Sequence, residues 1–172
     1  MKTMQNAMPR KSREARELVN VNALLRQVME LETDRLLAAG IVVDWQPAPV
    51  LPSITGRKNQ LRSLFKHLID NAILALKEAG GTQPELFLST RAMDGLVEVS
   101  IQDNGPGIAA EQRIKVFEPL YIGWRNRRGR AGMGLALARE IVAEHGGCVE
   151  IDPEYGQGCR IRLSLQKVAP DE

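Results

Sequence analysis

The sequence predicts an α+β fold, a two-layer α/β sandwich in which helices lie on one face of a mixed or antiparallel sheet. Long segments with the apolar periodicity of helices are mixed with short segments typical of strands, and the two kinds do not alternate regularly. Regular alternation would have indicated a parallel α/β fold instead. The 172 residues fit one domain with a sizeable core, with or without a short leader.

The first part of the chain predicts a leader, a helix and a strand. For residues 1–20, which begin with a polar, charged stretch, we expect a leader or the remnant of a preceding helical domain. From Val21, apolar residues recur at helical spacing until Gly40, a typical residue just after a helix. Residues 41–45 indicate a strand, and the prolines that follow indicate a loop. The apolar face of the helix is predicted to contain Leu24, Leu25, Val28, Leu31 and Leu36.

The central part predicts a long helix followed by two strands. Residues 58–79 carry a continuous apolar stripe, and Gly80-Gly81 ends it. Residues 85–91 and 96–102 indicate strands joined by a turn-prone Met-Asp-Gly. The stripe of the helix consists of Leu61, Leu64, Phe65, Leu68, Ile69, Ala72 and Leu76.

The last part predicts a short helix over residues 110–116, a long loop over 118–132 and a helix over 134–144. A loop of this length inside a compact domain is usually functional. Residues 148–151 and 159–165 alternate like a final antiparallel pair of strands. We interpret the Gly-Gln-Gly between them as a hairpin turn.

Composition excludes several classes of function. The net charge of +2 is too close to neutral to indicate nucleic-acid binding. No apolar run approaches the ~20 residues that span a membrane, so we expect a soluble, cytoplasmic chain without membrane contact of its own. Cys148 and Cys159 lie in predicted strands and could face each other, although two thiols in a soluble chain are most often buried small hydrophobes.

The long central helix carries a candidate metal ligand. Asn71 offers a neutral amide oxygen, a hard ligand suited to Mg²⁺, and His67 projects from the same face one turn earlier. Asparagine is mildly unfavourable inside a helix, so we expect a compensating role. Taken alone, Asn71 could equally be a surface amide.

A second candidate site follows the strand predicted over residues 96–102. The carboxylate of Asp103 can accept a hydrogen bond from an exocyclic amine such as that of adenine. Gly105 and Gly107 let the backbone approach a flat ring closely. An ordinary turn is the alternative interpretation, because Asn-Gly and Pro-Gly are turn dipeptides.

A third candidate site opens the last predicted helix. In Gly132-Met-Gly134-Leu, the glycines free backbone N–H groups to face an anion, and the helix N-terminus adds a partial positive charge. The motif is neither a Walker loop nor a dinucleotide fingerprint. A group of arginines in the preceding loop can attract phosphate groups. These are Arg125, Arg127, Arg128 and Arg130.

The order of four segments resembles that in the ATP-binding domain of sensor histidine kinases. These segments contain Asn71, Asp103, Phe117-Glu118-Pro119 and Gly132. These kinases belong to the GHKL family, together with gyrase, Hsp90 and MutL. The resemblance covers roughly residues 21–168 and implies a Bergerat-type fold with a mixed, mainly antiparallel five-stranded sheet and three main helices.

The resemblance also implies ATP or ADP as ligand, with Mg²⁺. Asn71 would be the metal ligand, Asp103 would contact adenine, and residues 118–132 would form the ATP lid. The nucleotide-binding residues that it implies are Asn71, Asp103, Gly105, Gly107, Ile108, Arg128, Arg130, Gly132, Met133, Gly134 and Leu135.

The chain departs from that family in three respects. It carries no phosphoacceptor, because its histidines are His67 and His145, so we expect a fragment or a domain that acts on another segment. After Phe-Glu-Pro the family's lid usually continues with aromatics, small hydroxyls and a lysine; here the cations remain, but the pattern is altered. His67 replaces the glutamate that activates water in the ATPase branches. We therefore expect little hydrolysis, with packing or a water-mediated metal contact as the main role of His67, although a neutral imidazole could act as a catalytic base.

Three functions stay open at this point. The leading hypothesis is a catalytic domain that binds Mg-ATP for phosphotransfer to a histidine on a separate dimerisation domain. The alternative is a kinase-like regulatory module, similar to NifL, that senses ADP or ATP and controls a partner protein such as a transcriptional activator. A degenerate domain without nucleotide is the third.

Overall fold

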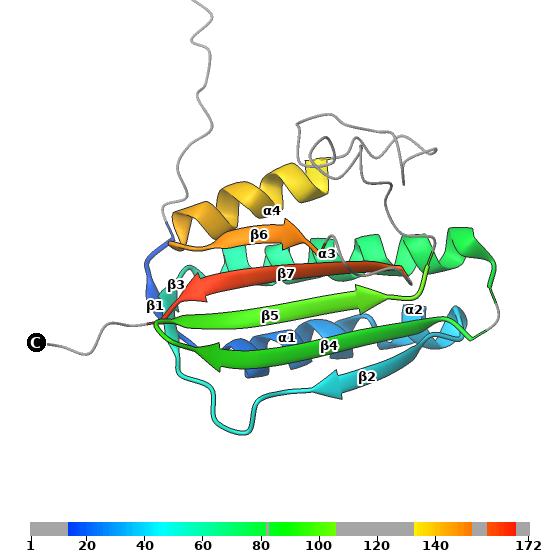
Figure 1. Ribbon diagram of the computed structural model, residues 1–172, viewed down its shortest axis with the longest axis horizontal. Coiled ribbons are helices and arrows are strands. Elements are labelled where there is room, and N and C mark those ends of the chain that lie inside the picture. Colours follow the sequence, from blue (N-terminus) through cyan, green and yellow to red (C-terminus); the bar gives the residue numbers. More distant parts are fainter. Residues whose placement is uncertain (1–13, 82, 106–132, 153–157, 168–172) are drawn as a thin grey trace, which may run out of the picture.

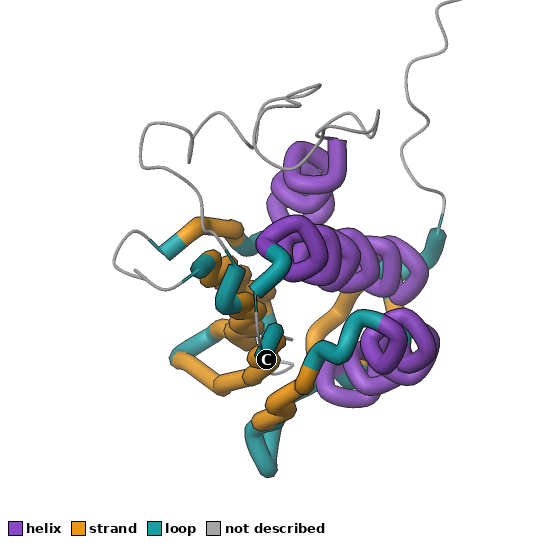
Figure 2. Tube along the Cα trace, turned by 90° about the vertical axis from the view of Figure 1, so that its right-hand side faces the viewer, coloured by secondary structure: helices purple, strands orange, loops and turns teal. Residues whose placement is uncertain are grey.

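The computed structural model describes residues 14–81, 83–105, 133–152 and 158–167. These residues form two layers, with the strands on one side and the main helices gathered on the other (Figures 1 and 2). This arrangement confirms the predicted α+β sandwich with helices on one face of a sheet.

The sheet is mixed and mainly antiparallel. Strand β2 (Val42–Gln46) runs parallel to β4 (Glu85–Met93). Strands β5 (Leu96–Asp103), β7 (Cys159–Gln166) and β6 (Cys148–Ile151) follow with antiparallel neighbours. The order across the five-stranded sheet is β2-β4-β5-β7-β6, which confirms the expected sheet.

Two of the helices agree closely with the sequence prediction. Helix α3 (Lys58–Ala79) has the predicted bounds and ends at Gly80, whose φ of 58° is the left-handed conformation that favours glycine. Every residue of its predicted apolar stripe is buried. Helix α4 (Met133–Glu144) packs against α3. None of the described helices combines the length and the apolar composition that crossing a membrane requires.

The helix predicted between Val21 and Gly40 is in fact two helices, so this prediction is wrong in detail. Helix α1 (Val21–Leu31) and helix α2 (Thr33–Ala38) meet at Glu32, whose side chain turns inward and is 5% exposed. Leu31, predicted on the apolar face, is 73% exposed. The physical reason is that the buried Glu32 carboxylate forms ion pairs with Arg35 of α2 and Lys66 of α3. Apolar periodicity gives no indication of such a buried acid.

Two short strands were not predicted. Strand β1 (Glu17–Val19) pairs antiparallel with β3 (Ile54–Gly56), which lies beyond the prolines of the loop after β2. Ile54 also forms a bridge to Lys167 after β7. The described part of residues 1–20 is thus attached to the domain through a strand pair.

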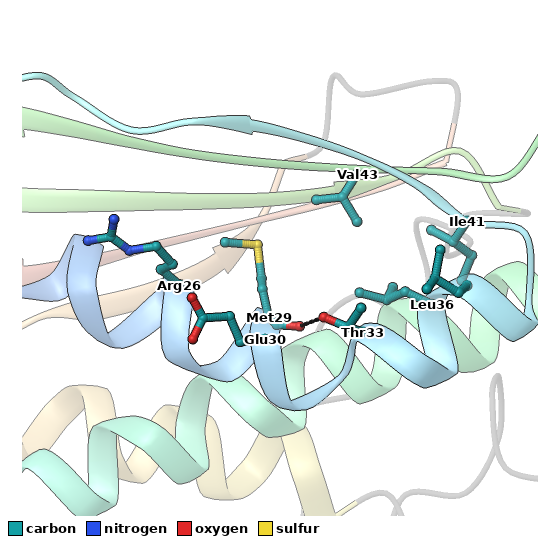
Figure 3. Close-up of a pocket in the computed structure, with 8 residues that line it drawn as sticks. Arg26, Met29, Glu30, Thr33, Leu36, Ile41 and Val43 are labelled. Atoms are coloured by element: carbon teal, nitrogen blue, oxygen red, sulfur yellow. Dashed lines mark hydrogen bonds between the residues drawn. The ribbon is translucent and has the colours of Figure 1, made fainter.

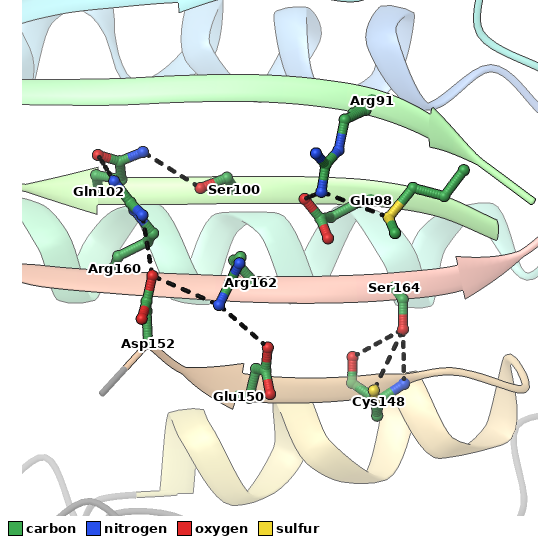
Figure 4. A network of polar contacts seen from close by, with 11 residues as sticks. Arg91, Glu98, Ser100, Gln102, Cys148, Glu150, Asp152, Arg160, Arg162 and Ser164 are labelled. Carbon is green, nitrogen blue, oxygen red and sulfur yellow. Dashed lines mark hydrogen bonds and ion pairs between the residues drawn. The ribbon is translucent and has the colours of Figure 1, made fainter. Parts of the chain in front are cut away.

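The face of the sheet away from the helices carries a polar network (Figure 4). Arg91 and Glu98 pair across β4 and β5 at 2.9 Å. Arg160 pairs with Asp152 at 2.9 Å and donates a hydrogen bond to Gln102 at 3.3 Å. Polar side chains on one face and apolar ones on the other are typical of a sheet with one solvated face.

The two cysteines have different environments, and neither forms a disulfide with another described residue. Cys159 is buried, as expected for a small hydrophobe, but Cys148 is exposed and its sulfur lies 3.3 Å from the Ser164 hydroxyl. The expectation of two buried thiols is therefore wrong for Cys148, because its side chain lies on the polar face of the sheet (Figure 4).

Candidate functional site

Asp103 is the last residue of β5 and is only 3% exposed. Alternation along the strand places it on the same face as Val99 and Ile101, which are buried in the core. Its backbone is held on both sides, by Leu86 of β4 and by Cys159 of β7. The carboxylate therefore lies under the helical layer, at the end of a central strand.

The turn after β5 packs directly on α3. The Oδ1 atom of Asp103 accepts a hydrogen bond from the N–H of Gly105 at 3.0 Å. A β-carbon on Gly105 would lie 3.0 Å from that oxygen and 3.4 Å from the carbonyl oxygen of Ala75 in α3. A glycine here thus allows the Asp103 turn to lie close to the helix.

The metal-ligand candidate lies one helical turn from this contact. Asn71 is four residues before Ala75, so both project from the same face of α3. Asn71 is half-buried, and so is His67, one turn further back. The structure therefore places Asn71 one helical turn from the point where the Asp103 turn contacts α3.

The start of α4 carries the third candidate site of the sequence analysis. Met133 and Gly134 are the first residues of this helix, and Leu135 is a core residue with 3% exposure. Figure 1 shows that α4 begins on the side where β5 ends. Several other predicted site residues lie outside the described part of the chain, as do the segment Phe117-Glu118-Pro119, the lid and the short helix over 110–116. These site residues are Gly107, Ile108, Arg128, Arg130 and Gly132.

Two residues that support Asp103 were missed by the sequence interpretation. Asn104 accepts a hydrogen bond from the N–H of Glu85 at 2.8 Å and donates one to the carbonyl of Gln83 at 3.0 Å. Gly158 has a φ of 140°, and its backbone presses against that of Asp103. The sequence predicts only a hairpin turn at this Gly-x-Gly, and it gives no signal of which distant strand the turn will touch.

The beginning of α3 is held by segments distant in the sequence. The Glu14 carboxylate accepts the N–H of Asn59 at 2.6 Å, a favourable position for an acid at a helix N-terminus. Nε2 of His145 accepts the N–H of Arg57 at 3.0 Å, and its Nδ1 donates to the carbonyl of Ile141 at 2.7 Å. Burial lowers the pKa of His145, which favours the neutral ring that these two hydrogen bonds require.

A separate hollow lies between α1, α2 and β2 (Figure 3). Its volume is about 330 Å³, and no predicted site residue lines it. Among the described residues, no group of three or more His, Cys, Asp or Glu side chains could hold a metal ion. Asn71, the metal-ligand candidate of the sequence analysis, is not among the residues that line the hollow. The lining residues are Arg26, Met29, Glu30, Thr33, Leu36, Leu37, Ile41 and Val43.

The sequence matches known proteins over most of its length. Residues 56–169 match the family described as histidine kinase-, DNA gyrase B-, and HSP90-like ATPase. The sensory histidine kinase/phosphatase NtrB of Azospirillum brasilense is 32% identical over 153 residues, which cover 81% of this chain and 36% of that protein. The NtrB protein of Rhodobacter capsulatus is 36% identical over 141 residues, covering 77% of this chain and 38% of that protein. The chain thus spans little more than a third of the length of these relatives.

Solved structures of similar fold are also histidine kinases. The catalytic domain of histidine kinase ThkA superposes with a TM-score of 0.78 at 24% identity, covering 88% of this chain and 95% of that domain. Full-length ShkA in complex with AMPPNP gives a TM-score of 0.77 at 30% identity, covering 92% of this chain and 33% of that protein. The likeness to ThkA shows the fold.

Proposed function

The chain belongs to the family of histidine kinase-, DNA gyrase B- and HSP90-like ATPases, and we propose that it is the ATP-binding catalytic domain of a sensor histidine kinase. The observation that carries the proposal is the buried carboxylate of Asp103, whose turn packs on α3 one helical turn from Asn71. Such a site combines an acceptor for a base with an amide ligand for a metal. The sensor kinases among its relatives support the same function.

In this proposal Asp103 accepts a hydrogen bond from the exocyclic amine of adenine. The carboxylate is 3% exposed, so little water competes for it when the base is absent or present. Gly105 and Gly107 would contact the adenine ring through backbone atoms, because they have no side chains. Ile108 would add an apolar contact to the ring. Charged acceptors form the stronger hydrogen bonds, which suits a contact that selects one base.

The phosphate groups would lie at the head of α4. Backbone N–H groups of Gly132, Met133, Gly134 and Leu135 at a helix N-terminus favour an anion. Arg128 and Arg130 of the lid, residues 118–132, would add positive charge next to the phosphates. Phosphoryl transfer needs mainly positioning and charge neutralisation, which these groups supply.

Asn71 would hold Mg²⁺ through its amide oxygen. The residue fits this role because it is half-buried on the face of α3 that meets the Asp103 turn, and because a neutral hard oxygen suits this ion. When bound, Mg²⁺ neutralises charge on the phosphates. His67 would pack beside this region or contact the metal through water, with little hydrolysis expected.

The proposed acceptor of the γ-phosphate is a histidine on a separate dimerisation domain. Neither histidine of this chain is proposed as the acceptor. His67 lies one helical turn before Asn71 on α3, and His145 is buried and accepts a hydrogen bond from the N–H of Arg57, just before α3. Because ATP is a cytoplasmic substrate, the proposal also places this domain in the cytoplasm. The sensory histidine kinases among the relatives support a histidine as the acceptor.

Two measurements test the proposal. Isothermal titration with ATP and ADP, each with and without Mg²⁺, should show binding that Mg²⁺ strengthens for ATP; absence of binding for both nucleotides would overturn it. A longer protein that includes the preceding domain should form acid-labile phosphohistidine from labelled ATP. Tight ADP binding without any labelled histidine would favour the nucleotide-sensing module instead.

A further inference from the structure

A closed ring of ion pairs joins α2 to α3 directly beside Asn71. Its members are Glu32, Arg35, Lys66 and Asp70, and we name it the α2–α3 charge ring. Arg35 Nη1 donates to Glu32 Oε2 at 2.7 Å and also to Asp70 Oδ1. Lys66 Nζ donates to Glu32 Oε1 at 3.0 Å and to Asp70 Oδ2 at 3.2 Å. Each carboxylate oxygen of the ring therefore has a cationic partner.

The acids of the ring are inside and the cations are at its rim. Glu32 and Asp70 are 5% and 9% exposed, whereas Lys66 is exposed and Arg35 is half-buried. Hydrogen bonds to Asp70 and Glu32 raise the pKa values of Arg35 and Lys66, so both remain charged. A buried ion pair is costly to break, because removing one partner leaves an uncompensated charge.

The ring holds α3 along one side. Lys66 and Asp70 are four residues apart, so they lie on one face of α3. Arg35 of α2 pairs with Asp70, and Glu32, just before α2, pairs with Lys66. Asn71, the next residue after Asp70, points about 100° further around the axis. The break at Glu32 matters here, because it turns the Glu32 carboxylate towards this face of α3.

We propose that the α2–α3 charge ring is a positioning device that fixes the rotation of α3 and thereby directs Asn71 at the nucleotide-bound metal. A helix rotation of ~20° would move a side-chain end that lies ~6 Å from the axis by roughly 2 Å, which is enough to misplace a metal ligand. Apolar packing alone tolerates small rotations better than paired charges of fixed geometry. This inference rests on the proposed role of Asn71.

The test removes one charge of the ring in the full chain. Asp70→Asn should reduce the gain in ATP affinity on adding Mg²⁺ by about tenfold, the usual effect of losing a residue that orients a ligand. The affinity for metal-free ADP should stay within about twofold of wild type, because Asp103 is untouched. Asp70→Glu keeps the carboxylate and should restore most of the Mg²⁺ effect.

Controls separate positioning from stability. Glu98→Gln breaks the Arg91 pair on the far face of the sheet and should leave the Mg²⁺ effect unchanged. Should Asp70→Asn not fold, Lys66→Gln replaces an exposed cation and should change the Mg²⁺ effect in the same direction. A folded Asp70→Asn protein with the wild-type Mg²⁺ effect would overturn the inference.

A readout without nucleotide distinguishes this inference from the proposed function. The side-chain amide NMR signals of Asn71 should shift in nucleotide-free Asp70→Asn and stay in place in Glu98→Gln. Unmoved Asn71 signals would overturn the positioning role even if the wild type binds nucleotide. If the wild type binds neither ATP nor ADP, the proposed function fails. The NMR signals still decide whether the α2–α3 charge ring fixes the orientation of the Asn71 side chain.

Discussion

A β-carbon placed on Gly158 would lie 1.9 Å from the carbonyl oxygen of Asp103. Gly158 immediately precedes β7, whose first residue, Cys159, pairs with Asp103 on β5. The backbone at the start of one strand thus presses on the backbone that carries the proposed adenine acceptor. Only glycine permits this contact, because its φ of 140° also lies where other residues are strained.

Gly158→Ala should therefore displace Asp103 and weaken both stability and nucleotide binding. We expect the free energy of unfolding to fall by about 2–4 kcal/mol, from backbone strain and overpacking together. Urea unfolding and ADP titration measure the two effects. Gly81→Ala is the matched control, since a β-carbon there meets no atom within 4 Å. Wild-type ADP affinity in a folded Gly158→Ala protein would contradict the supporting role of Gly158.

Asp103→Asn should weaken ATP and ADP alike, whether or not Mg²⁺ is present. Replacing the buried carboxylate removes a charged acceptor, which costs about 1–3 kcal/mol, or roughly 5- to 150-fold in affinity. Isothermal titration of both nucleotides checks this. Equal affinities for mutant and wild type would show that the base does not contact residue 103.

Asn71→Ala should affect the metal-dependent part of binding. Loss of the amide oxygen should weaken Mg-ATP by about tenfold while metal-free ADP binds nearly as before. Titrations with Mg²⁺ and with a chelator separate the two. Asn59→Ala, exposed in the first turn of the same helix, should leave both affinities unchanged. Equal losses for the two nucleotide forms would instead assign Asn71 a purely structural role.

His145 should make stability depend on pH. Its pKa is lowered in the folded protein by burial, so the unfolded chain binds a proton more readily. The contribution of the neutral ring is then fully present above the unfolded pKa of about 6.5 and is lost as pH falls from there towards the folded pKa. Urea unfolding of wild type should therefore show a decline in stability below that pH.

His145→Gln is the comparison for this pH effect. Its amide can still accept a hydrogen bond from the N–H of Arg57 but does not titrate, so the stability of this variant should fall less as the pH drops below about 6.5. Parallel curves for the two proteins would show that His145 does not titrate on unfolding.

Most of the fold could be predicted from local patterns. Helix α3 has the predicted bounds, and all strands of the five-stranded sheet lie within about two residues of the predicted segments. Asp103 and Gly105 could be assigned to one turn, because both depend on short-range backbone chemistry. The α1–α2 break and the β1–β3 pair could not, since each depends on partners far along the chain.

The sequence by itself determined which segments are helices and strands, and which residue types could bind a base, a metal and phosphates. These properties follow from periodicity and from side-chain chemistry, which act within one segment. Only the tertiary structure decided that Gly158 presses on Asp103, that Gly105 lies against Ala75, and that Glu32 closes a charge ring beside Asn71. Such contacts join residues from separate elements, and their positions are set by how the two layers pack together.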